Sequence, residues 1–229
     1  MSAMTEPNTA LEDLQAQISG DLRPVQPFAV TRWMAAFVVL FCIATVLFLW
    51  RSTGWQTNAT LLGSFWHWVL SALELTVAFV LLACVLREAV PGRSPSLALL
   101  TFGAVGAGVL HVIISMASAA HDPVPVPDGM GWMYGVYCFR YEVALGAPCL
   151  LFAVWLSSRG LTSRPRRVGI LGGVAAGLTA DAIWRLFCPY NEPAHAFGSH
   201  SMGIMAVLVI GLICTACWDA WRLRAWRNR

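Results

Sequence analysis

A polar stretch of thirteen residues, 188–200, carries the side chains with the clearest chemistry in this chain. It places a thiol, a carboxylate and two imidazoles, from Cys188, Glu192, His195 and His200, between two apolar runs. Thiolates and imidazoles bind zinc, cadmium and similar ions, and two thiols can also form a disulfide. The residue types therefore predict either a thiol switch or a site for a thiophilic metal ion.

A second polar gap, 121–138, ends at another cysteine. Cys138 opens the apolar run after this gap, and Cys188 closes the next apolar run along the chain. Antiparallel packing of these two runs would bring both thiols together. We predict a sensing pair of Cys138 and Cys188, which either bond to each other or join His195 and His200 around a metal ion; inert interface cysteines are the remaining alternative. The spacing of the four residues does not match a standard zinc signature.

The composition excludes an ordinary soluble domain. Of the 229 residues, 58% are hydrophobic and only 12% are charged, which is typical of an integral membrane protein. All fifteen basic residues are arginines, a bias that suggests a GC-rich bacterial genome, and the net charge is +3. The arginines lie beside the ends of apolar runs, where membrane topology explains them. Nucleic acid is therefore not predicted as a partner, whereas membrane lipid is.

The apolar runs must position the thiols. Each approaches or reaches the ~17–25 residues that a helix needs to cross a bilayer, and we predict an all-α, polytopic membrane protein with a six-transmembrane-helix bundle. Arginines concentrate on alternate connections, so both termini are expected in the cytoplasm and the thiols on the periplasmic side of the bacterial inner membrane. The predicted spans are 34–50, 65–86, 97–119, 139–156, 168–187 and 201–221.

Residues 1–32 are predicted to form a separate cytoplasmic segment ahead of the transmembrane domain, 33–229. A short helix with one apolar stripe is expected there, because apolar residues recur at spacings of three and four. Such a helix is only marginally stable alone. It is therefore expected to bind the membrane surface, the rest of the chain or another protein. The stripe consists of Leu11, Leu14, Ile18 and Leu22.

Ionisable residues also occur inside the predicted spans. Such groups are costly in a membrane and usually have partners. Asp181 and Arg185 are four residues apart on one helical face, which predicts an ion pair. Glu74 and His111 are expected to hydrogen-bond to neighbouring spans. Glu142, one turn after the first cysteine of the pair, is expected either to cap its span or to lie near the thiols.

The order and spacing of these features resemble those of the NrsF family, the negative regulators of sigma-F-type extracytoplasmic-function sigma factors. The resemblance covers nearly the whole chain, and it comes from the combination of features rather than from one motif. These features are the N-terminal helix followed by residues 21–27 (DLRPVQP), six spans with short loops, residues 90–93 (VPGR), Cys138 with Pro148 in the fourth span, and the Cys188 loop ending with Phe197 and His200.

The resemblance implies a membrane-bound anti-sigma factor. Its N-terminal segment would sequester an extracytoplasmic-function sigma factor, and cysteines matching Cys138 and Cys188 would be needed for the response to metal or oxidative stress. Phe187 departs from the family pattern, which has a histidine before the second cysteine. We expect no enzymatic activity, and no cofactor other than a transient thiophilic metal ion.

Two other functions are alternatives to an anti-sigma factor. A membrane thiol oxidoreductase would pass electrons from the cysteines to a quinone, but the sequence shows neither an outward C-x-x-C motif nor a clear quinone pocket. A small transporter would use Glu74, His111 and Asp181. Transporters commonly contain inverted repeats, and the two halves of this chain show no convincing similarity.

Overall fold

The computed structural model describes residues 12–13, 15–17, 39–41, 43–45, 47, 51, 65–88, 95–121, 124–159 and 164–227. The chain divides into two compact units, Met1–Val30 and Thr31–Arg229. In the first unit the described residues, 12–13 and 15–17, are helical and exposed, as the predicted short helix requires. The four residues of its apolar stripe, Leu11, Leu14, Ile18 and Leu22, lie outside the described residues.

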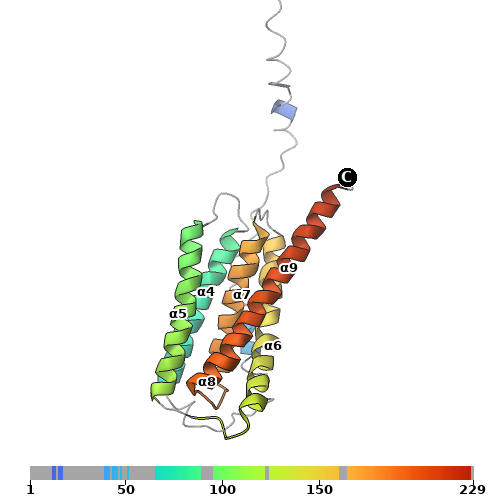
Figure 1. Cartoon of the computed structure of the whole chain (residues 1–229). Coiled ribbons are helices and arrows are strands. Elements are labelled where there is room, and N and C mark those ends of the chain that lie inside the picture. Colours follow the sequence, from blue (N-terminus) through green and yellow to red (C-terminus); the bar gives the residue numbers. More distant parts are fainter. Residues whose placement is uncertain are drawn as a thin grey trace, which may run out of the picture. The chain divides into compact units, whose positions relative to one another are not determined.

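The described part of the second unit is built from helices, which confirms the all-α prediction. The long helices lie side by side as a bundle, and a short helical segment leads into the last helix at one end of it (Figure 1). The elements in chain order are α4 (Phe65–Glu88), α5 (Leu97–His121), α6 (Gly131–Ser158), α7 (Pro165–Trp184), α8 (Pro193–His195), the π-helical turn η1 (Ala196–His200) and α9 (Ser201–Arg227).

Four helical segments of the described chain are long and apolar enough to cross a membrane, so the structure does not support six spans. The first predicted span, 34–50, lies mostly outside the described residues. The fifth, 168–187, forms a helix in α7, but Arg166, Arg167 and Asp181 reduce its apolar character. The four segments are Phe65–Glu88, Leu97–Ala120, Gly131–Ser158 and Pro193–Arg224.

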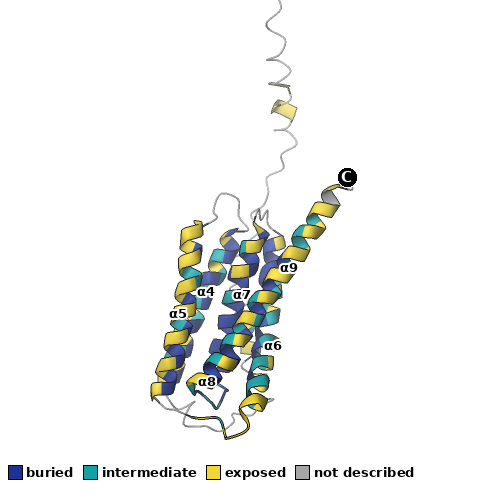
Figure 2. Cartoon of the chain, viewed as in Figure 1, coloured by how far each residue is buried: buried dark blue, intermediate teal, exposed yellow. Residues whose placement is uncertain are grey.

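α7 forms the centre of the bundle, and it contacts α9, α4 and α6. Nearly all of its residues are buried, whereas α5 and the C-terminal part of α9 are largely exposed (Figure 2). The outer face of α5 carries large apolar side chains such as Phe102, which is 78% exposed. Exposed apolar faces of this kind are expected where helices contact lipid.

Glycines allow α7 to pack closely against α9. A Cβ atom added at Gly173 would lie 2.6 Å from the Leu208 Cα, and one added at Gly177 would lie 2.9 Å from the Ile204 Cα. Both distances are shorter than real Cβ contacts, so the two backbones approach too closely for a side chain. Small residues at intervals of four are a common basis for helix association in membranes. This packing fixes α9 against α7, and with it the polar residues at their ends.

Candidate thiol and metal site

The two polar loops predicted from the sequence lie against each other. The Asn191 backbone N–H donates to the Val124 carbonyl oxygen at 3.2 Å, and the Val124 N–H donates to the Asn191 side-chain oxygen at 2.7 Å. The Asn191 amide also donates to the Ser118 carbonyl oxygen at 3.3 Å. These bonds join the loop after α7, which contains Cys188, to the loop before α6.

Cys138 and Cys188 are adjacent, as predicted. Their sulfurs are 3.4 Å apart, well beyond the ~2.05 Å of a disulfide bond, and both are free thiols. Their exposed fractions are only 1% and 5%. Cys188 is held by a tight turn after α7, in which its N–H donates to the Trp184 carbonyl oxygen at 2.8 Å. Cys138 lies inside α6, which begins at Gly131 rather than near Phe139 as predicted.

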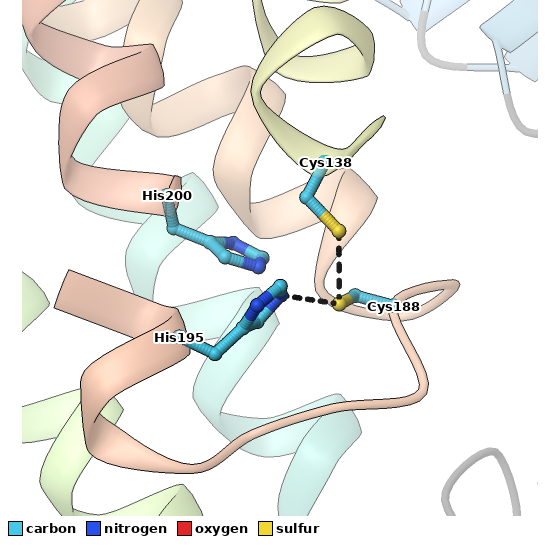
Figure 3. Close-up of side chains that lie close together, drawn as sticks. All are labelled: Cys138, Cys188, His195 and His200. Atoms are coloured by element: carbon cyan, nitrogen blue, oxygen red, sulfur yellow. Dashed lines mark hydrogen bonds between the residues drawn. The ribbon is translucent and has the colours of Figure 1, made fainter. Parts of the chain in front are cut away.

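His195 and His200 complete a cluster with the two cysteines. The His195 Nε2 is 3.4 Å from the Cys188 sulfur, and one ligand atom from each of the four buried residues lies within 4.8 Å of the others. The side chains converge from α6, from the loop after α7 and from the α8–η1 segment (Figure 3). The π-helical turn, rather than a regular zinc-motif spacing, brings the two imidazoles together.

The polar contacts of His200 resemble those of a metal-ligating histidine. Its Nδ1 donates to the Asp181 Oδ1 at 2.6 Å and lies 2.7 Å from the Glu142 Oε1. Its Nε2 is buried and has no hydrogen-bond partner among the described residues. A carboxylate that accepts a hydrogen bond from one ring nitrogen leaves the other nitrogen oriented for a metal.

The four donors fit a thiophilic divalent ion such as zinc or cadmium. In a tetrahedral zinc site with Zn–S bonds of ~2.3 Å, two sulfur ligands lie about 3.7 Å apart, close to the 3.4 Å between the two cysteine sulfurs. Two thiolates would also neutralise the charge of a divalent ion inside an apolar bundle. The donor set, its burial and the unpartnered His200 nitrogen are thus compatible with a metal.

A buried ionic network adjoins this cluster. Arg185 donates to the Asp181 Oδ2 at 2.6 Å, and the His111 Nδ1 is 3.0 Å from the Glu74 Oε1 and 3.1 Å from the Asp181 Oδ2. These contacts confirm both the predicted ion pair and the predicted partnering of Glu74 and His111. Because Asp181 also accepts from His200, charged groups connect α4 and α5 to the thiol cluster.

Glu142 lies near the thiols, the second of its two predicted positions, but its contact with His200 was missed. Glu142 is four residues after Cys138 and therefore lies on the same face of α6. Gly203 of α9 provides room for it, since an added Cβ there would overlap the Glu142 carboxylate. The contact depends on how α9 packs against α6, which the local sequence does not specify.

The loop after α7 places Cys188 and Tyr190 in surroundings that disfavour their charged forms. Burial, together with the neighbouring Cys138 thiol, raises the pKa of the Cys188 thiol well above its ordinary value. Partial burial and a hydrogen bond with Tyr134 raise the pKa of Tyr190 to about 12. Both groups therefore remain protonated at neutral pH, and a metal ion or an oxidant must displace the proton of Cys188 when it reacts with the thiol.

Comparison with known proteins agrees with the sequence resemblance. No curated protein and no solved structure matches the chain. The family model described as NrsF, negative regulator of sigma F, matches residues 18–221. That match includes Cys138, Cys188, His195, His200 and the described helices of the bundle up to residue 221 of α9. Because it covers most of the 229 residues, the chain belongs to the NrsF family of negative regulators of sigma F.

Proposed function

We propose that this protein is a membrane-bound anti-sigma factor that releases an extracytoplasmic-function sigma factor when its thiol pair reacts. Family membership supports the regulation of a sigma factor. The observation that carries the sensing part is the buried contact between Cys138 and Cys188, whose sulfurs are 3.4 Å apart. In this proposal the thiols react once per signal, and the protein is not an enzyme.

The N-terminal segment, 1–32, is the part that would bind the sigma factor. Met1–Val30 is one of the two units into which the chain divides. The apolar stripe of Leu11, Leu14, Ile18 and Leu22 offers a hydrophobic helix face, and burying such a face against a partner stabilises an otherwise marginal helix. Sequestration in this way would keep the sigma factor from RNA polymerase.

The proposed membrane topology has six spans in the inner membrane. The run 34–50 would be the first span, and α7 the fifth, tolerated in spite of its charges because the other helices surround it. The arginines on alternate connections would then face the cytoplasm together with both termini. Cys138 and Cys188 would consequently face the periplasm, where disulfides persist and metal ions arrive from outside.

Two chemical events could provide the signal at the thiol pair. One is a disulfide, which requires the sulfurs to move closer by more than 1 Å. The other is capture of a zinc or cadmium ion by Cys138, Cys188, His195 and His200. Either event would join α6 to the loop after α7, and metal capture would also fix η1, which leads into α9. Shifting the ratio of bound to released sigma factor from 99:1 to 1:99 needs ~5.5 kcal/mol of coupling between the thiol site and the N-terminal segment. Partial release of the sigma factor is therefore the expected response.

The proposal is tested by isolating the protein with its partner and then removing the thiols. A sigma factor is expected to co-purify with the full-length protein, and to be lost when residues 1–32 are deleted. Replacing Cys138 and Cys188 together by serine is expected to abolish induction by cadmium or oxidants.

The matched control replaces Cys214 and Cys217 by serine. These cysteines belong to α9 and are not members of the thiol cluster, so normal induction is expected. Induction that persists without Cys138 and Cys188 would contradict the sensing mechanism. Failure to recover any sigma factor would contradict the regulatory one.

A further inference from the structure

A cavity of about 290 Å³ lies beside Cys138 and offers an approach to the thiol pair. It lies between α6 and the turn that follows α7. Its volume is at the lower end of the range for small-molecule sites, enough for about one substituted ring. Apart from Cys138, the principal lining residues are Met133, Tyr134, Tyr137, Trp184, Phe187 and Tyr190.

Aromatic rings dominate the walls of this cavity. Tyr134 and Tyr190 have ring centroids 4.7 Å apart, and Tyr137 and Trp184 are 5.9 Å apart. Trp184 also stacks on Tyr141 at 4.3 Å with an interplanar angle of 4°, which orients the indole plane. Flat apolar ligands gain from stacking on such rings.

The charge of the lining selects further among ligands. No arginine, lysine, histidine, aspartate or glutamate is among the described residues that line the cavity. An anionic oxidant would therefore lose its hydration without gaining a counter-charge. A neutral planar molecule would lose little hydration free energy when it enters the cavity.

One polar group of the wall lacks a partner. The Trp184 indole N–H is buried and donates to no acceptor among the described residues. The whole residue is only 1% exposed, so water does not replace the missing acceptor. A buried donor without an acceptor costs about 1–3 kcal/mol, and such groups are rare in native proteins. The nitrogen itself is closed off from solvent, so a carbonyl oxygen on the ligand would satisfy it only after the indole ring has moved.

We propose that this cavity binds quinones and that a bound quinone oxidises Cys138 and Cys188 to a disulfide. A quinone combines the required properties: it is planar and neutral, it carries carbonyl oxygens, and it accepts two electrons. This inference rests on the thiol-pair function proposed above and names the oxidant. The cavity also supplies the quinone pocket that the sequence did not reveal.

The reaction needs only the two thiols and one quinone molecule. The S–H bonds of Cys138 and Cys188 break, and one S–S bond forms between sulfurs that are already 3.4 Å apart. The two electrons and two protons go to the quinone, whose carbonyl oxygens become the hydroxyls of the hydroquinone. One hydroquinone is thus released for each disulfide formed.

The test uses full-length, reduced protein in lipid nanodiscs. Duroquinone is the aqueous probe, because its four methyl groups leave no ring carbon open to thiol addition. Ubiquinone dissolved in the nanodisc lipid is the membrane-borne probe. Hydroquinone absorbance and mass spectrometry of the linked Cys138 and Cys188 peptides follow the reaction. A rate that saturates with at least one quinone, with one hydroquinone per disulfide, is expected.

Met133→Trp tests the cavity without altering the thiols. Met133 is 56% exposed, so a larger side chain can be accommodated while reducing access to the cavity. At least a tenfold slower reaction with quinone is expected, with no change in the rate with hydrogen peroxide, which is small enough to reach the thiols without binding. The matched control, Met205→Trp, changes a methionine of similar exposure, 55%, on α9 and is expected to leave both rates unchanged.

Trp184→Phe tests the hydrogen bond by removing the N–H while keeping an aromatic ring. A higher quinone concentration at half-saturation is expected, with an unchanged peroxide rate. A quinone rate that rises linearly with concentration and is the same in both Trp184 forms and both Met133 forms overturns the inference. If peroxide also fails to form the disulfide in the wild-type protein, the disulfide route of the proposed sensor fails with it, and metal capture is left as the signal.

Discussion

Glu142 is expected to control metal affinity without touching the metal. It is 1% exposed, and its Oε1 is 2.7 Å from the His200 Nδ1. Glu142→Gln keeps the shape of the side chain but replaces the carboxyl group that lies against the His200 Nδ1. Loss of such a partner typically lowers metal affinity by 10–100-fold, which corresponds to about 1.4–2.7 kcal/mol.

Cadmium competition against a chelator measures this effect. Binding is followed by the ultraviolet charge-transfer absorbance of cadmium–thiolate bonds in detergent-solubilised, reduced protein. Glu88→Gln is the matched control, since Glu88 is 3% exposed and its carboxylate lies 3.5 Å from Arg167 rather than in the thiol cluster. Cadmium affinity in Glu142→Gln equal to that of the wild type would refute the role assigned to His200 and its carboxylates.

Two further predictions concern Cys188 and the helix packing. Because burial raises the pKa of Cys188, its alkylation by iodoacetamide in a Cys138→Ser variant should increase about tenfold per pH unit up to and beyond pH ~8.5; a plateau near neutral pH would contradict this. Gly173→Ala should clearly lower the thermal unfolding temperature, since its Cβ would meet Leu208 backbone at 2.6 Å, whereas Gly172→Ala meets only the Leu150 Cδ1 at 3.5 Å and should be tolerated. Equal unfolding temperatures in the two variants would show that this contact relaxes at no cost.

The sequence predicted helices reliably where apolar residues formed long runs. Helix boundaries were less predictable. α6 begins at Gly131 because the aromatic residues that follow continue the helix beyond the apolar run, and the turn before it uses Gly129 at a positive φ of 74°. The polar stretch 188–200 was predicted as a loop, yet it becomes helical from Pro193, a residue suited to the first turn of a helix.

The parts of the site that follow from where residues lie along the chain could be predicted. Cys138 lies near the start of α6 and Cys188 lies just after the end of α7, the next long helix, so antiparallel packing alone brings them together. The contacts of His200 with Asp181 and Glu142 require α6, α7 and η1 to pack together at the same level of the bundle. The sequence of a single chain does not show this packing. The aromatic cavity was missed for the same reason, because Tyr134, Trp184 and Tyr190 are each unremarkable near the end of a membrane helix.

The π-helical turn η1 determines how α9, the helix that follows it, is rotated about its own axis. Its closing bond runs from the Ser201 N–H to the Ala196 carbonyl oxygen, five residues back, so it holds one residue more than an α-helical turn. Each residue rotates a helix by about 100°. Deleting one residue from 196–199 would therefore turn Gly203 away from Glu142 and Gly211 away from Gly169. The same five residues thus set both the direction of the His200 imidazole and the packing of α9, so a one-residue deletion would disrupt the two together.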